Sequence, residues 1–191
     1  MAAKIPLLEG ETDTATLMAH GYDPDLSSYS PYHGAMYAVI HSLAKIACAG
    51  GDYAKARLTM QEYFQRMTED PTGWGKPMAA LLGAYEAQKR MGTPGIGGKD
   101  SMSGTFNDVS VPPTLVSIAV GIAKASQIGS PEFKQAGGAV ALLPVLPGAD
   151  GMIDFEALKA NLERVGQLVR QGQVQAAATV GQGGAAAAVS K

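Results

Sequence analysis

Apolar residues recur at helical spacing in three segments of the chain, residues 34–49, 72–91 and 155–169. Glycines follow the first two segments, as is common just past the end of a helix. A fourth, alanine-rich helix is predicted after Gly183 and Gly184, running to the end of the chain. The side chains that we expect to face inward are Met78, Leu81, Leu82 and Tyr85 in the second helix and Phe155, Leu158, Leu162, Val165 and Val169 in the third.

Shorter apolar runs between these helices predict strands. The runs are residues 14–19 (expected at a sheet edge), 56–64, 116–123, 139–143 and 174–180. Strands that alternate with helices are typical of an α+β or α/β protein. The polar segment at residues 126–138 is the natural boundary between two structural units.

Composition narrows the class of protein. The 191 residues carry a net charge of -2, so the basic surface of a nucleic-acid-binding protein is missing. No apolar run reaches the ~18 residues of a membrane span, and the N-terminus lacks a signal peptide's apolar core. We therefore expect a cytoplasmic protein that binds neither nucleic acid nor membrane. The one cysteine, Cys48, excludes an internal disulfide, and its apolar surroundings predict a buried, unreactive thiol.

The most informative chemistry lies in residues 97–104, which read GGKDSMSG. Glycine lets the backbone at Gly98 approach a ligand, and Lys99 can neutralise a phosphate group. Asp100 is a hard oxygen ligand of the kind that Mg²⁺ prefers. The hydroxyls of Ser101 and Ser103 can donate to phosphate oxygens. A polar glycine turn between two strands explains the same residues equally well, and the spacing is not that of a P-loop.

This motif resembles one in the second synthetase half of phosphoribosylformylglycinamidine synthases, which are enzymes of purine synthesis. Further segments match that family in order: residues 30–35 (SPYHGA), 49–52 (AGGD), 74–77 (WGKP), 111–114 (VPPT) and 130–133 (SPEF). The resemblance implies an α+β fold of the aminoimidazole-ribonucleotide-synthetase type, with helices on a mostly antiparallel sheet. Residues 1–130 would be the C-terminal portion of an N-terminal-type domain, and residues 131–191 the beginning of a C-terminal-type domain.

The resemblance also implies a function. Members of the family are ATP- and glutamine-dependent ligases that convert formylglycinamide ribonucleotide to formylglycinamidine ribonucleotide, with ATP or ADP and Mg²⁺ as cofactors. Their chains are far longer, so this chain would be a piece that is inactive alone and has the rest of the synthase, including its glutaminase domain, as partner. Its unpaired faces would favour homo-oligomers. In the family the motif aspartate, here Asp100, binds Mg²⁺, and a neighbouring serine contacts the nucleotide.

Two departures from the family pattern bear on that function. The family usually adds a glutamate and an asparagine four residues apart as metal ligands, where this chain has His41 and Lys45. Lys45 could replace the metal by placing its ammonium against phosphate, or both residues could form the polar side of a helix. The family's HDVSDGG run is here ATVGQGG, residues 178–184, without its histidine and carboxylates. We therefore expect an auxiliary or degenerate nucleotide site that does not need Mg²⁺, or alternatively a structural module of the same fold that has lost nucleotide binding.

Overall fold

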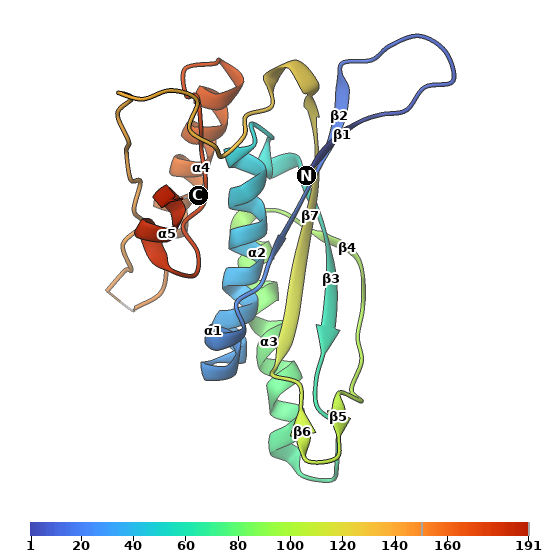
Figure 1. Ribbon diagram of the computed structural model, residues 1–191. Helices are drawn as coiled ribbons and strands as arrows, with labels where there is room; N and C mark the ends of the chain where they lie inside the picture. The colour runs from blue at the N-terminus through green and yellow to red at the C-terminus, as the bar shows by residue number, and fades with distance from the viewer. Residues whose placement is uncertain (150, 191) are drawn as a thin grey trace. The chain divides into compact units, whose positions relative to one another are not determined.

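The computed structural model describes residues 1–149 and 151–190. The chain divides into two compact units that interleave along the sequence. The first unit comprises Met1–Leu17, Ala44–Tyr53 and Gly121–Lys191, and the second comprises Met18–Leu43 and Ala54–Val120. Both units contain helices and strands (Figure 1).

A five-stranded sheet has the order β1-β2-β7-β3-β4. Its strands are β1 (Ala2–Lys4), β2 (Thr14–Gly21), β3 (Arg57–Tyr63), β4 (Gly95–Lys99) and β7 (Thr114–Lys124). The pairs β1–β2 and β3–β7 are antiparallel, whereas β4 lies parallel to β3. A separate hairpin joins β5 (Thr105–Phe106) to β6 (Val109–Ser110).

The strands predicted near residues 56–64 and 116–123 are confirmed as β3 and β7. The run at residues 14–19 is also a strand, but its predicted place at the sheet edge is wrong. β1 pairs along its outer side, with Ala3 opposite Thr16, and therefore forms the edge itself.

The helices are α1 (Pro24–Tyr29), α2 (Pro31–Cys48), α3 (Pro71–Met91), α4 (Phe155–Arg170) and α5 (Gly184–Ser190). Short 3-10 turns occupy Tyr53–Lys55 and Ala125–Gln127. All four predicted helices are thus confirmed. No helix among residues 1–149 and 151–190 combines the length and apolarity that a membrane crossing requires.

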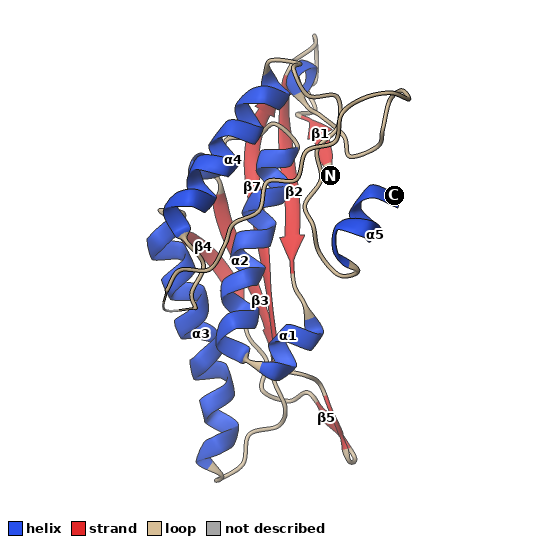
Figure 2. Cartoon of the chain, turned by 90° about the vertical axis from the view of Figure 1, so that its left-hand side faces the viewer, coloured by secondary structure: helices blue, strands red, loops and turns tan. Residues whose placement is uncertain are grey.

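In the second unit, helices cover one face of the strands (Figure 2). Leu115, Ser117 and Ala119 of β7 are buried on the covered face. The Ser42 hydroxyl of α2 lies 3.0 Å from that of Ser117, so these two buried hydroxyls form a hydrogen bond with each other. Met36 of α2 is fully buried there too, as part of the unit's apolar core.

Helix α3 turns the opposite way from its predicted orientation. Its buried residues are Gly73, Pro77, Ala80, Gly83, Ala84, Ala87 and Met91, and the residues predicted to face inward are exposed instead. A methyl group on Gly83 would overlap the carbonyl oxygen of Tyr32, so the helix approaches its neighbour too closely for a large side chain. The prediction for Met78, Leu81, Leu82 and Tyr85 is therefore wrong.

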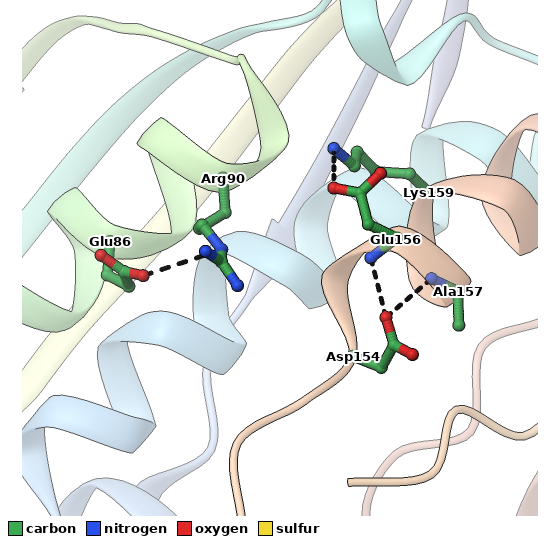
Figure 3. Close-up of polar contacts among 6 residues, drawn as sticks. All are labelled: Glu86, Arg90, Asp154, Glu156, Ala157 and Lys159. Atoms are coloured by element: carbon green, nitrogen blue, oxygen red, sulfur yellow. Dashed lines mark hydrogen bonds and ion pairs between the residues drawn. The ribbon is translucent and has the colours of Figure 1, made fainter. Parts of the chain in front are cut away.

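In the first unit, α4 begins at an N-cap, Asp154, whose carboxylate accepts the N–H groups of Glu156 and Ala157 at 3.0 Å (Figure 3). The apolar side chains of α4 are buried as predicted, except that Val165 is half-buried. At the other end, Arg170 donates to the carbonyl oxygens of Gly50 and Gly51, at 3.1 and 3.2 Å. These bonds fix the C-terminal end of α4 against the turn that follows α2.

Two predicted strands in this unit are wrong. Residues 139–143, all of them described, form no strand, and Val140, Leu142 and Leu143 are at least half exposed. Residues 174–180 contribute only one isolated bridge, between Ala176 and Ser130. An apolar run becomes a strand only where a second strand pairs with it, and no described strand lies beside either segment.

Candidate functional site

The glycine-rich motif occupies the edge of the sheet in the second unit. β4 extends through both glycines of the motif to Lys99. Gly98 lies opposite Met60 of β3, and a methyl group on Gly98 would come within 2.9 Å of the Met60 carbonyl oxygen. The glycine at this position therefore permits a close approach between two strands, and the whole of β4 is exposed.

A buried residue, Phe64, which directly follows β3, holds the loop after β4 through both of its backbone groups. The Phe64 N–H donates to the Ser101 carbonyl oxygen and the Phe64 carbonyl oxygen accepts from the Gly104 N–H, both at 2.9 Å. Gly104 is packed against the side chain of Val111. Because both backbone groups of a fully buried residue hold it, the loop presents its side chains from a fixed frame.

Two of the predicted anion-binding side chains, Ser101 and Ser103, come together at this frame, and Lys99 ends the strand that leads into it. The hydroxyls of Ser101 and Ser103 lie 3.2 Å apart, so that one could hydrogen-bond to the other or both could face one ligand oxygen. The Lys99 ammonium lies 4.9 Å from the centre of the Tyr63 ring, which attracts a cation. The exposed ring thus helps to position the charge that the sequence assigned to phosphate binding.

Glu62 is a site residue that the sequence analysis missed. It lies on β3 and is only 7% exposed. Burial, and the negative charge of Asp100 nearby, raise the pKa of the Glu62 carboxyl. The sequence did carry a signal for Glu62. Leu58, Met60 and Glu62 are two residues apart and therefore share one strand face, so a carboxylate occupies a position where an apolar residue is expected.

The fit of this site to a metal ion rests on two carboxylates, Asp100 and Glu62. No group of three or more His, Cys, Asp or Glu side chains that could hold a metal exists among residues 1–149 and 151–190. Mg²⁺ commonly binds through one or two carboxylates when substrate phosphates complete its shell. Glu62 is buried whereas Asp100 is exposed, so Asp100 is the main candidate.

The remaining predicted residues lie on α2. His41 belongs to the second unit, and Lys45, in the last turn of the helix, belongs to the first. Both are half-buried. The role of Lys45 in phosphate binding stays a prediction.

A cavity of about 410 Å³ lies elsewhere, in the first unit. Its walls include Ser130, Lys134 and Arg170 and none of the predicted site residues. Both cations already have acceptors: Lys134 pairs with Glu132 at 3.2 Å, and Arg170 holds two carbonyl oxygens. Hydrogen bonds from Ser130 and the backbone, and then Lys134, lower the pKa of Glu132 to about 2. The two cations that line the cavity are therefore already paired with groups of the chain itself.

No protein-family model matches the sequence, and neither does any curated protein. Solved structures of PurL from Thermotoga maritima do share the fold. The complex with FGAR aligns with a TM-score of 0.67 and 17% identity over 91% of this chain, and the complex with AMPPCP with 0.64 and 20% over 85%. A structure described as phosphoribosylformylglycinamidine synthase II from the same organism gives 0.62 and 19% over 90%.

These likenesses establish the fold. The α+β class and the synthetase-like architecture that the sequence resemblance implied are confirmed. This chain spans 31% of the length of the FGAR complex and 26% of the AMPPCP complex. A part for this chain in the reaction of the longer proteins is therefore a proposal.

Proposed function

We propose that the chain is a nucleotide-binding part of an ATP-dependent ligase that converts formylglycinamide ribonucleotide to its amidine. The shared fold and the ordered motifs support this proposal. T. maritima PurL has been solved with ATP, ADP, AMPPCP and FGAR, so this fold accepts both a nucleotide and a ribonucleotide substrate in that protein. Alone, the chain would be inactive, and the rest of such a synthase, with its glutaminase domain, would be its partner.

The observation that carries the proposal is the pair of serine hydroxyls in the loop after β4, next in sequence to the lysine that ends the strand. Lys99 supplies a positive charge, Ser101 and Ser103 supply two hydroxyls 3.2 Å apart, and the backbone at Gly98 lies on an exposed sheet edge. Phosphoryl-transfer sites work mainly by positioning phosphates and neutralising their charge. These groups would bind a nucleotide phosphate.

The site would not require Mg²⁺. Asp100 is the metal candidate, and because the neighbouring Glu62 is only 7% exposed, Asp100 is the carboxylate of the two that is open to an ion. A cation that binds through one carboxylate depends on the nucleotide for most of its ligands. In our proposal Lys99 supplies the neutralising charge instead.

The test is a calorimetric titration of the 191-residue chain with ATP and with ADP, in excess Mg²⁺ and in excess chelator. We expect similar affinities in both buffers and a loss of about tenfold for Lys99→Ala, the value of one charge-assisted contact. Lys89→Ala, which removes another lysine of the same unit, is the matched control and should leave the affinity unchanged. If nucleotide binding instead requires Mg²⁺ and Asp100→Asn abolishes that binding, the metal site of the family persists here.

A second candidate function is a structural module of the same fold that has lost nucleotide binding. The glycines of the motif favour it, because packing alone accounts for them: Gly98 faces Met60, and Gly104 faces Val111 and Phe64. A glycine that packing requires needs no ligand to explain it. A folded chain that shows no saturable nucleotide binding in either buffer would select this candidate.

A further inference from the structure

Helix α3 carries a continuous apolar stripe on its exposed side. The α3 stripe comprises Trp74 (53% exposed), Met78 (58%), Leu81 (48%), Leu82 (49%) and Tyr85 (59%). Their spacing places them on one face of the helix, over a length of about 16 Å. Scattered exposed apolar residues are ordinary, but a contiguous patch marks an interaction surface.

The stripe cannot turn inward. The opposite side of α3 consists mostly of small residues, and its closest approach is at Gly83, where even a methyl group would overlap the Tyr32 carbonyl oxygen. The large side chains of the stripe do not fit where that backbone contact lies. The sequence thus places its largest apolar residues on the only side of the helix that has room for them.

The two ends of the stripe carry opposite charges. Glu69 and Asp70 lie at the N-terminal end, and Asp70 is four residues before Trp74. Lys89 and Arg90 lie at the C-terminal end, with the Lys89 ammonium 5.9 Å from the centre of the Tyr85 ring and hence on the stripe's own face. Arg90 pairs with Glu86 at 3.8 Å along the helix (Figure 3).

We propose that the α3 stripe binds the same stripe of a second copy of this chain, with the two helices antiparallel. Two-fold pairing about Ala79 brings position 69 opposite position 89 of the partner, because 79 lies midway between them. The acidic end of each stripe then meets the basic end of the other, and the apolar centres cover one another. A parallel arrangement would instead set like charges together, so the charge pattern selects the antiparallel dimer.

The first experiment is sedimentation velocity of the 191-residue chain over a range of concentrations. We expect a monomer–dimer equilibrium that Leu81→Asp weakens by about tenfold or more, since a charge at the centre of an apolar interface is left unpaired. The matched control is Val109→Asp on the β5–β6 hairpin, at a site 68% exposed, which should leave the equilibrium unchanged. Circular dichroism checks the fold, and Leu81→Gln repeats the test with a milder change.

The second experiment tests the orientation through the end charges. Glu69→Lys and Lys89→Glu should each weaken the dimer by about threefold or more, and the double variant should restore it, because both charge pairs are then re-formed with reversed signs. A chain that stays monomeric at all concentrations would overturn the proposal and leave the stripe to a different protein surface. So would a dimer that Leu81→Asp does not weaken, or a double variant that dimerises no better than the single ones.

Discussion

Helices α3 and α4 show how far an apolar pattern determines orientation. Each has large apolar residues at helical spacing. In α4 these residues are buried: Phe155, Leu158, Leu162 and Val169 form the core side of the helix. In α3 the equivalent residues form the exposed stripe, and glycine, alanine and proline face inward.

The two helices differ in the residues on the side opposite their large apolar residues. The side of α4 opposite its apolar stripe includes Glu163 and Arg164, so only one face can be buried. The opposite side of α3 has mostly small residues, and its half-buried Lys76 is hydrogen-bonded to Gln65 at 2.7 Å, so this side too can pack. Close approach at Gly83 makes the small side the inner one. Helical periodicity therefore identifies an apolar face, and the competition between faces decides which one is buried.

The largest expected effect tests this contrast with one kind of change in both helices. Leu162 is 7% exposed in α4 and Leu82 is 49% exposed in α3. Leu162→Ala should lower the free energy of unfolding by about 2–5 kcal/mol, through lost burial and the cavity left behind. Leu82→Ala should change it by about 0.5 kcal/mol or less, as at other surface sites.

Urea titrations followed by circular dichroism, on dilute samples so that association does not contribute, give both values. Equal losses for the two variants would mean that α3 buries Leu82 in solution, and the contrast between the helices would fail.

A smaller effect concerns two glycines of α3, one exposed and one on its inner face. Alanine is about 1 kcal/mol better than glycine in a helix, so Gly75→Ala, with no described atom within 4 Å of the added methyl group, should stabilise the chain by about 0.5–1 kcal/mol. Gly83→Ala should instead destabilise it by about 1–3 kcal/mol, because the methyl group overlaps the Tyr32 carbonyl oxygen. Thermal unfolding of the two variants measures opposite signs for the same substitution. A stabilising Gly83→Ala would mean that close packing against Tyr32 does not decide which side of α3 faces inward.

The elements that sequence could predict are those whose stabilising contacts are local or strongly patterned. All the predicted helices are present, since helical spacing and terminal glycines are recorded within a few residues. The segments at 139–143 and 174–180 failed because a strand needs a neighbour that the local pattern does not reveal. The edge position of residues 14–19 failed for the same reason, since β1 is a three-residue strand with no pattern of its own.

The candidate site shows the same division. The motif indicated Lys99, Ser101 and Ser103, and the structure brings the two serine hydroxyls together because they are close in sequence. Glu62 lies almost forty residues earlier, and only the parallel pairing of β3 with β4 places it beside Asp100. Contacts that depend on strand register cannot be predicted from the spacing of residues along the chain.

Helices α3 and α4 both begin at an aspartate N-cap, so the way they start does not explain why they bury different faces. Asp154 caps α4, and Asp70 caps α3 by accepting the Thr72 N–H at 2.9 Å and the Thr72 hydroxyl at 2.5 Å. The hydrogen bonds from Thr72 lower the pKa of the Asp70 carboxyl below its ordinary value of 3.8. The start of each helix is set by local capping, whichever face the helix later buries.

The smallest expected effect is the pH dependence of the α3 cap. A carboxyl whose pKa is lowered on folding stabilises the folded chain fully above its unfolded pKa of 3.8, and this contribution disappears as the pH falls through the lower folded pKa. Asp70→Ala should therefore lower the urea midpoint of the chain near pH 7 and progressively less below about pH 4. Asp70→Asn keeps a side-chain oxygen that can accept the Thr72 N–H, so its loss near neutral pH should be smaller and should vary less with pH. If the difference between Asp70→Ala and the unchanged chain were the same at pH 7 and pH 3, the charge of Asp70 would contribute nothing, and the cap would act through its geometry alone.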